Sequence, residues 1–402
     1  MSAPAHRRPA AAHLRAAVER RYPAFLADLG LMTGVDSGSY DSEGVDAVGA
    51  MAAERLRGLG FAVRSVPVGS TPDGRRLGDA LVARHAGRAP GGRRLLLMAH
   101  LDTVYEAGTA AARPLRTEDG TAYSPGACDD KGGLLLGIAA IGALLDLGAE
   151  DWGELVFLCT PDEEIGSPGS RPLTEALAKE ADFGLCLECA RENGDLVTAR
   201  KGVVDLRLTV RGRAAHSGVE PERGANAALA AAHLVIALQE LGGGPGGTTV
   251  NVGRVRAGSR TNVVCDEAVL DVEVRSATRD GLWDARREIA RLASRTWVEG
   301  TSVEVAEGEE CPPLERTPQV ADLADLALAL AAELGVRAGA AATGGAADAN
   351  FAAGTGLPVL DGLGPVGGGD HSPGEWLDLS SVVPRGALLA ALISRLGTRG
   401  AG

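Results

Sequence analysis

The chain has 402 residues, of which 45% are hydrophobic, so it has enough apolar material for the cores of two or three domains. Aromatic residues make up only 3%, which predicts a core built mainly from Ala, Leu, Val and Gly. A formal net charge of −13 makes the chain a poor candidate for binding nucleic acid or an anionic membrane surface.

The N-terminal segment shows no pattern of a secretion signal. Its early basic residues are followed by further charges at Arg15, Glu19, Arg20 and Arg21 instead of a continuous apolar stretch. The longest apolar run, residues 132–145, is well short of the roughly 20 residues that a membrane helix needs, so we expect a buried helix there. We therefore expect a cytoplasmic protein with no membrane partner.

The cysteines do not suggest a disulfide framework. Cys186 and Cys189 have the spacing of a redox or zinc pair, but no second pair accompanies them and they fall in a strand-like run. We interpret them as plain buried thiols. All six cysteines are scattered through apolar or motif-rich segments: Cys128, Cys159, Cys186, Cys189, Cys265 and Cys311.

Helix and strand patterns alternate over the first 200 residues. Strands that alternate with helices predict a mostly parallel sheet covered by helices, which is an α/β domain. The predicted elements are a helix at 45–60, a strand at 93–100, a helix at 131–148, and strands at 153–160 and 182–189.

The pattern changes between residues 201 and 313. The predicted order there is strand, helix, strand, strand, helix, strand, which is typical of a ferredoxin-like α+β domain. Its strands alternate apolar and polar residues, as expected for an antiparallel sheet with one solvated face. We therefore expect one α/β domain, residues 1–200 and 314–402, interrupted by a smaller inserted domain, residues 201–313. The α/β part resumes with predicted helices near 320–335 and 383–397 around the segment 357–365.

Acidic and imidazole side chains follow the predicted strands of the α/β domain. Sites in open α/β sheets lie at the carboxyl ends of the strands, so we expect these side chains to meet at one edge. Clustered carboxylates are tolerated when cations lie among them, and imidazole with carboxylate ligands suits zinc and similar ions. The sequence therefore predicts a two-metal hydrolytic site. The residues concerned are His100, Asp102, Asp129, Asp130, Asp162, Glu163, Glu164, Glu188 and His371.

Each of these motifs also has a simpler structural explanation. A histidine after a strand is usually a satisfied structural residue, and "DEE" at 162–164 alone is usually a solvated turn. "DDKGG" at 129–133 alone is compatible with a helix N-terminus that favours negative charge. The combination of complementary residue types, in the order expected of one sheet edge, favours the metal site.

The motifs together resemble the M20 family of dinuclear zinc peptidases and deacylases, and most closely its glutamate carboxypeptidase branch. The resemblance runs from about residue 34 to 397. It is carried by "HLDTV", "GACDDKGG", "TPDEEIGS", "CLECA", "RGRAAHSG", "TNVV", "TGGAADANFAA" and "GGGDHSPGEWLDL". The fold that it implies is a zinc-peptidase-like catalytic domain with an inserted lid and dimerisation domain.

The resemblance implies a role for each residue of the expected metal site. Asp129 would bridge two Zn²⁺ ions per subunit, and its bond to Asp130 would be a cis peptide. Glu163 would be the general base, and Asp102 would orient a ligand histidine. The remaining expected ligands are His100 and Glu188 for one ion and Glu164 and His371 for the other. Co²⁺ or Mn²⁺ would suit the same ligands.

The resemblance also implies a homodimer formed through the inserted domain. His216 would reach the partner's site and polarise the scissile carbonyl, and Asn262 would bind substrate in a similar way. Arg275 would bind the substrate's carboxylate. Gly344 and Gly345 would form a loop that the substrate backbone approaches closely. Alternatively, His216 is an exposed residue at a strand end and Arg275 a solvent-facing charge of the sheet.

The implied reaction is hydrolysis of an amide bond next to a free carboxylate, with release of a C-terminal amino acid. Glu309 and Glu310 stand where glutamate-cleaving relatives carry basic residues, so a neutral or basic side chain is an alternative. The runner-up is therefore an N-acyl-amino-acid deacylase of the acetylornithine deacetylase or succinyl-diaminopimelate desuccinylase type. A non-catalytic binding protein is less favoured, because no expected ligand or base is missing. A phosphatase that uses the same metal pair is less favoured still, because His216 and Arg275 in the implied roles suit an amide substrate next to a carboxylate.

Overall fold

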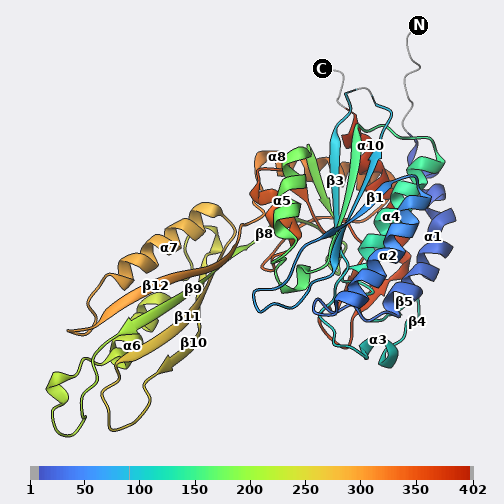
Figure 1. The fold of residues 1–402 in the computed structure, drawn as a ribbon. Helices are drawn as coiled ribbons and strands as arrows, with labels where there is room; N and C mark the ends of the chain where they lie inside the picture. The colour runs from blue at the N-terminus through green and yellow to red at the C-terminus, as the bar shows by residue number, and fades with distance from the viewer. Residues whose placement is uncertain (1–8, 90, 399–402) are drawn as a thin grey trace. The chain divides into compact units, whose positions relative to one another are not determined.

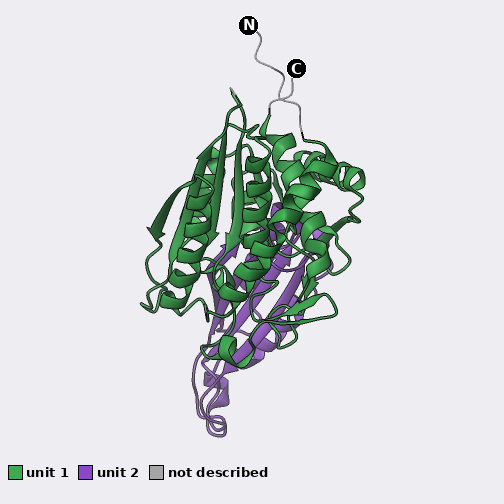
Figure 2. Cartoon of the chain, turned by 90° about the vertical axis from the view of Figure 1, so that its right-hand side faces the viewer, with its two compact units in different colours: residues 1–198, 316–342, 347–402 green, residues 199–315, 343–346 purple. Residues whose placement is uncertain are grey.

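A computed structural model describes residues 9–89 and 91–398; the basic start of the chain, residues 1–8, lies outside the described residues. The chain forms two compact units (Figure 2). Unit 1 contains the described residues up to 198 together with 316–342 and those from 347 onward, and unit 2 contains residues 199–315 and 343–346.

Unit 1 is built on a six-stranded mixed sheet with the order β1-β2-β6-β3-β7-β14. The pairs β6–β3, β3–β7 and β7–β14 are parallel, whereas β1 and β2 are antiparallel additions at one edge. The central strands are buried apolar runs, as expected for a sheet covered on both faces. The bounds are β1 Ala62–Pro67, β2 Asp79–Ala86, β3 Arg94–His100, β6 Glu154–Thr160, β7 Phe183–Cys186 and β14 Val359–Leu360.

Helices cover both sides of this sheet (Figure 1). Helix α4 is apolar all round, and every residue from Lys131 to Leu144 is buried, so the predicted buried helix is confirmed. The helix bounds are α1 Ala11–Thr33, α2 Ser42–Gly58, α3 Thr109–Ala112, α4 Lys131–Asp146, α5 Arg171–Glu180, α8 Pro318–Leu334, α9 Asp348–Gly354 and α10 Leu379–Gly397.

One helix among the described residues, α10, has the length and apolar composition to cross a membrane. However, 78% of its most apolar window is buried inside the protein. It packs against α1, α4 and α8, as the central helix of a layer does. The burial therefore accounts for its apolar composition.

Several elements of unit 1 were not predicted. They include α1, the antiparallel strands β1 and β2, and helices α5 and α9. A small sheet β15-β16-β5-β4 and the pair β13–β8 were also missed. The predicted strand at 182–189 was too long, since β7 ends at Cys186. The additional strands are β4 Arg116–Glu118, β5 Thr121–Tyr123, β8 Leu196–Arg200, β13 Ala340–Thr343, β15 Gly367–Gly368 and β16 Trp376–Asp378.

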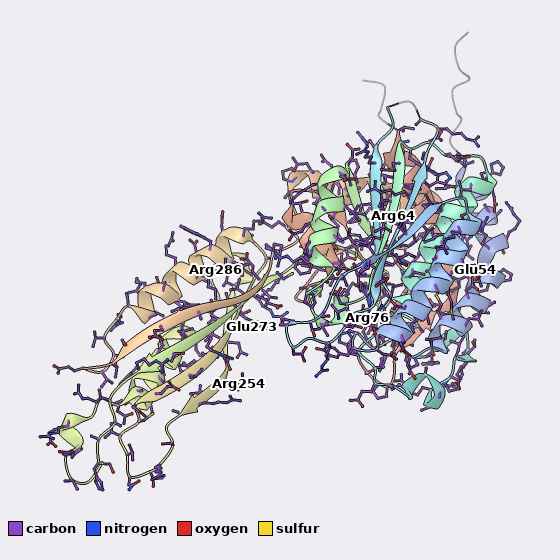
Figure 3. All side chains as sticks on the ribbon, viewed as in Figure 1. Glu54, Arg64, Arg76, Arg254, Glu273 and Arg286 are labelled. Carbon is purple, nitrogen blue, oxygen red and sulfur yellow. The ribbon has the colours of Figure 1, made fainter. Side chains whose placement is uncertain are left out.

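Unit 2 has a four-stranded antiparallel sheet with the order β10-β11-β9-β12 and two helices on one face. Buried and open positions alternate along β9 and β11, because the helices cover only one face. Arg286 belongs to helix α7, whereas Arg254 and Glu273 belong to the sheet (Figure 3). The bounds are β9 Gly202–Arg211, α6 Ala227–Gln239, β10 Thr249–Ala257, β11 Glu267–Ser276, α7 Arg279–Ala293 and β12 Ser302–Cys311.

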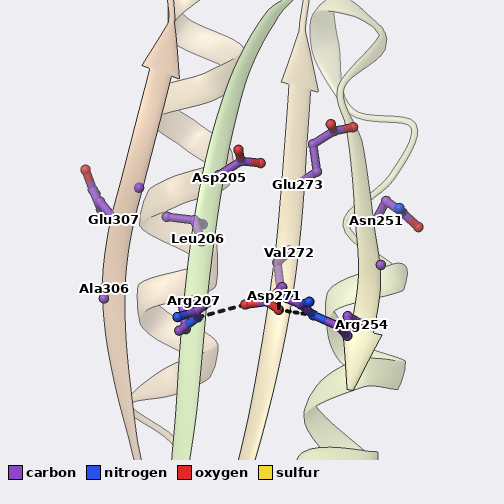
Figure 4. A pocket seen from close by; sticks show the side chains of 12 residues that line it. Asp205, Leu206, Arg207, Asn251, Arg254, Asp271, Val272, Glu273, Ala306 and Glu307 are labelled. Atoms are coloured by element: carbon purple, nitrogen blue, oxygen red, sulfur yellow. Dashed lines mark hydrogen bonds and ion pairs between the residues drawn. The ribbon is translucent and has the colours of Figure 1, made fainter. Parts of the chain in front are cut away.

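The open face of the unit 2 sheet carries a depression of about 600 Å³. Within it Arg207 and Arg254 both pair with Asp271, which places a neutralising carboxylate between two cations (Figure 4). None of the predicted metal ligands lines this depression. We therefore interpret it as a solvated, charge-paired surface and not as the hydrolytic site.

Candidate metal centre

The predicted metal ligands meet at the carboxyl edge of the parallel strands of unit 1. His100 is the last residue of β3, and it lies beside Thr160, the last residue of β6. The segments that follow β3, β6 and β7 carry Asp102, Glu163 and Glu164, and Glu188 respectively. Because these strands are parallel and adjacent, the side chains that follow them lie close together although they are far apart in the sequence.

Asp129 lies between two histidines. Its Oδ1 is 2.9 Å from Nε2 of His100, and its Oδ2 is 3.2 Å from Nε2 of His371. The histidines extend the cluster, because Nε2 of His371 is 3.0 Å from Glu164 Oε2 and Nε2 of His100 is 3.7 Å from Glu188 Oε1. The peptide bond between Asp129 and Asp130 is cis. One carboxylate therefore belongs to two groups of donors.

The carboxyl groups of the centre are partly buried beside one another. Burial, together with the nearby charge of Glu188, raises the pKa of Glu163 well above its usual value. Burial also raises the pKa of Glu164. Burial opposes the ionisation of Asp129, but the hydrogen bonds with His100 and His371 outweigh it and lower the pKa of that carboxyl. Hydrogen bonds with Asp129 and Glu164 raise the pKa of His371 to about 10.

The donor set fits divalent cations. Two groups have donor atoms that all lie within 4.8 Å of one another: His100 with Asp129 and Glu164, and His100 with Glu163 and Glu188. Their atoms are imidazole nitrogens and carboxylate oxygens, which are the ligands that zinc and related ions take. Cations among these carboxylates would offset the repulsion that their burial imposes. The residues present therefore suit the metal-dependent chemistry expected from the sequence.

Asp102 lies beside the ring of His100. Nδ1 of His100 is 3.0 Å from the backbone carbonyl of Asp102 and 3.4 Å from its carboxylate. The carboxylate itself accepts hydrogen bonds from the backbone amides of Glu163 and Glu164 and from the hydroxyl of Ser39. Asp102 thus contacts the ring of His100 through its backbone carbonyl and its carboxylate, and its side chain also accepts hydrogen bonds from the "TPDEEIGS" segment.

Two further buried carboxylates support the same segment. Asp162 accepts hydrogen bonds from the amides of Gly169 and Ser170 and from the Ser170 hydroxyl. Asp348, at the first turn of α9, accepts from the hydroxyls of Thr160 and Ser167. The carboxylates of this region therefore have two different surroundings: Glu163 and Glu164 lie at the centre, whereas Asp162 and Asp348 accept hydrogen bonds from the surrounding loop.

Glu375 was missed by the sequence reasoning. Its buried carboxylate accepts hydrogen bonds from the backbone amides of Gly126, Cys128 and Asp129, and from the Tyr105 hydroxyl. Burial raises the pKa of Glu375 despite these donors. The available signal was its place in "GGGDHSPGEW", four residues after His371.

The predicted substrate-binding residues lie in unit 2 and form two pairs. His216 and Asn262 are exposed at adjacent turns, where the Ser217 amide donates to the carbonyl of Asn262. Arg275 holds Glu273 with two nitrogens and donates a third hydrogen bond to the carbonyl of Gly344. Among described atoms, a Cβ at Gly344 would meet nothing within 4 Å and one at Gly345 only an Arg200 nitrogen at 3.8 Å.

Comparisons with known proteins agree with this architecture. Residues 96–395 match the model of peptidase family M20/M25/M40. The chain is 33% identical to carboxypeptidase G2 of Pseudomonas sp. (strain RS-16) over 93% of its own length and 90% of the relative's. It is 34% identical to an acetylornithine deacetylase of Myxococcus xanthus over 46% of this chain and 50% of that protein.

A solved structure gives the same result for the fold. The aminopeptidase PepT of Bacillus cereus superposes with a TM-score of 0.77 at 23% identity, and the match covers 93% of this chain and 98% of that one. At this identity the likeness concerns the fold alone. The mixed sheet, the family model and the relative that spans most of the chain lead to one conclusion. The chain belongs to peptidase family M20/M25/M40, whose members are metal-dependent peptidases and amidohydrolases.

Proposed function

We propose that the protein hydrolyses an amide bond next to a free carboxylate and releases a C-terminal amino acid, as a glutamate carboxypeptidase-like exopeptidase. The observation that carries the proposal is Asp129, whose two oxygens face His100 and His371 separately. That arrangement suits a carboxylate shared between two cations. The similarity to carboxypeptidase G2 over most of the chain supports this choice of reaction.

The residues of unit 1 divide into ligands and a base. His100, Asp129 and Glu188 would hold one ion, and Asp129, Glu164 and His371 the other. Bound divalent ions supply Lewis-acid polarisation of the carbonyl and lower the pKa of a water at the site. Glu163 takes the proton from the attacking water and delivers it to the leaving amine. Burial beside Glu188 raises the pKa of Glu163, which makes its carboxylate a stronger acceptor for that proton.

The residues of unit 2 would recognise the substrate. His216, contributed by a second subunit, and Asn262 would stabilise the developing negative charge on the carbonyl oxygen. Arg275 would bind the free carboxylate of the substrate. To do so, its guanidinium must give up part of its ion pair with Glu273. Gly344 and Gly345 leave open space beside Arg275 and Arg200, which suits close approach of a substrate backbone.

The alternative is an N-acyl-amino-acid deacylase, supported by partial similarity to an acetylornithine deacetylase. The sequence favours this alternative through the acidic pair Glu309 and Glu310, which would repel an acidic substrate side chain. Glu310 forms an ion pair with Arg286 at 2.6 Å, so that part of its charge is compensated. The pairing weakens the case for repulsion of an acidic side chain, and we therefore keep the exopeptidase as the first choice.

We also propose a homodimer formed through unit 2. Leu229 and Ile236 of α6 are 49% and 61% exposed, and they lie on the side of the helix that faces away from the core of unit 2. Val255 of the edge strand β10 is 49% exposed as well. A second copy that covers this apolar surface would remove it from water. The cytoplasmic location remains a prediction.

The proposed function is tested by incubating protein loaded with Zn²⁺, Co²⁺ or Mn²⁺ with a substrate panel and analysing the products by mass spectrometry. The panel contains N-acetyl, N-succinyl and N-benzoyl amino acids and peptides that end in Glu, Arg or Leu. Cleavage that a chelator abolishes supports the hydrolase, and release of C-terminal Glu supports the exopeptidase. Preference for acetyl or succinyl amino acids would favour the deacylase. Absence of all cleavage, with two ions bound, would contradict both.

A further inference from the structure

A third group of donor atoms lies beside the two groups of the proposed dinuclear centre. The sulfur atoms of Cys128 and Cys189 and a carboxylate oxygen of Asp370 all lie within 4.8 Å of one another. The two sulfur atoms are therefore close to each other, and Cys189 Sγ is 3.8 and 3.9 Å from the two oxygens of Asp370. We call these three residues the thiol cluster. It joins three segments that are far apart in the sequence.

The thiol cluster is not the apolar environment of an ordinary buried cysteine. Cys128 is fully buried and Cys189 is 9% exposed, yet both face a carboxylate. The backbone leaves room for this arrangement, since a Cβ at Gly367 would lie 2.3 Å from Cys128 Sγ. The negative charges of Asp129 and Glu188 lie nearby. A cation would be attracted to this position.

We propose that the thiol cluster binds a thiophilic divalent cation, such as Zn²⁺ or Cd²⁺, at a site separate from the dinuclear centre. A tetrahedral zinc ion has bonds of about 2.3 Å to sulfur and about 2.0–2.2 Å to oxygen, which separates its ligand atoms by roughly 3.5–3.8 Å. The observed spacing from Cys189 to Asp370 is close to this range. Asp370 is more open to solvent than the thiols, so water can complete the coordination.

The site has a structural connection to the proposed catalytic metals. Cys128 precedes Asp129, Cys189 follows Glu188, and Asp370 precedes His371 in the chain. A cation in the thiol cluster therefore ties together three segments that each carry a ligand of the dinuclear centre. Because such an ion binds the folded chain, it also stabilises the protein against unfolding.

The test is a Cd²⁺ titration of the full-length protein, followed by the ultraviolet thiolate-to-cadmium charge-transfer absorbance and by the number of ions bound. None of the proposed dinuclear ligands is a thiol, so this absorbance distinguishes the thiol cluster from the dinuclear centre. We expect wild-type protein to bind about three ions with the absorbance present. Cys128→Ser and Cys189→Ser should bind about two ions and lose most of the absorbance.

Matched controls separate this site from other thiols and from misfolding. Cys265→Ser, which removes a partly buried thiol of unit 2, should keep the full absorbance. Asp370→Asn keeps both thiols and should retain the absorbance but require more Cd²⁺. The proposal is overturned if wild-type protein lacks the absorbance, if both cysteine variants retain it, or if thiol titration shows that Cys128 and Cys189 have formed a disulfide. Loss of hydrolysis is not a readout here, so the proposed function stands or fails separately.

Discussion

Glu375 accepts a hydrogen bond from the backbone amide of Asp129 at 3.1 Å. The same carboxylate accepts two more from the amides of Gly126 and Cys128, each at 2.8 Å. The Tyr105 hydroxyl lies 2.8 Å from a carboxylate oxygen of Glu375 and 2.8 Å from the carbonyl oxygen of Ser372, next to His371, so its one hydrogen is available to either acceptor. One buried side chain therefore holds the loop of the proposed bridging residue beside the segment of a second proposed ligand.

The first prediction is that Glu375→Gln weakens metal binding. The amide group of glutamine has only one acceptor oxygen, so one of the three backbone donors would be left unpaired or would face an NH₂ group. Removal of a group that orients metal ligands typically lowers affinity by about 10–100-fold. Competition with a chelator measures the affinity. Glu118→Gln, a change at an exposed ion-paired residue, is the control, and equal affinities in the two variants would contradict the prediction.

The second prediction separates the proposed base from a proposed ligand. Glu163→Gln should lower kcat by about 10²–10⁴-fold, because glutamine cannot accept the proton from water. It should leave the metal content unchanged. Glu164→Gln, the adjacent substitution, should lower the metal content itself. Steady-state kinetics and elemental analysis of the same preparations measure both, and a Glu163→Gln protein with wild-type kcat would exclude this residue as the base.

The third prediction concerns removal of metal. A ligand at 100 times its Kd stabilises a folded protein by about 2.7 kcal/mol, so the chelated protein should unfold at a lower temperature. The repulsion among Glu163, Glu164 and Glu188 adds to this loss, because no cation then lies between them. Calorimetry before chelation, after it and after return of the metal measures the change. Identical unfolding temperatures in all three states would argue against a metal centre.

The convergence of the proposed ligands was the most predictable part of the molecule. Apolar runs such as 94–100 and 154–160 indicate strands, and parallel strands place the residues that follow them at one edge. The parts that were missed have weaker local signals. Strand β1 alternates irregularly and is largely exposed, and α1 combines many charges with an internal Pro23. Such elements are stabilised by tertiary contacts that no local pattern reveals.

Long-range side-chain contacts were beyond the sequence reasoning for the same reason. Glu375 meets Asp129 across 246 positions of the chain, and no periodicity connects the two. The sequence spacing groups Cys189 with Cys186. In the structure, however, the sulfur atom of Cys189 lies close to that of Cys128. Sequence spacing identifies pairs within one element. Pairs that form between loops at a sheet edge depend on the packing of the whole unit.

The fourth prediction tests the proposed dimer. Replacing Leu229 and Ile236 of α6 by Glu should shift the protein toward monomers, because charge would be buried in the apolar interface. If His216 acts across the dimer, turnover should fall together with the dimer fraction. Trp283→Glu on α7, where the side chain is 59% exposed, is the control. Analytical ultracentrifugation and kinetics at several protein concentrations measure both quantities, and a fully active monomer would contradict the prediction.

The fifth prediction concerns the pH dependence of stability through His85 of β2, which pairs with Leu155 near the start of β6, away from the carboxyl edge that carries the proposed ligands. Its ring lies 5.0 Å from that of Phe61 and 5.8 Å from that of Trp152, and its Nδ1 has no hydrogen-bond partner among the described residues. Burial lowers the pKa of His85 below 6.5; the charge of Glu150 opposes the shift and that of Arg88 assists it. The neutral ring is therefore the form that fits this site.

The sign of the effect follows from linkage. The unfolded chain binds a proton at His85 more readily than the folded protein does, so this contribution to stability is present above pH 6.5 and is lost as the pH falls through the lowered pKa. His85→Phe keeps an aromatic ring and removes the titration. As the pH is lowered from about 8 to about 5, the unfolding temperature of wild type should fall more than that of the variant, so the difference between them should change in favour of the variant. A difference between the two proteins that stays constant over this range would show that His85 does not titrate with folding.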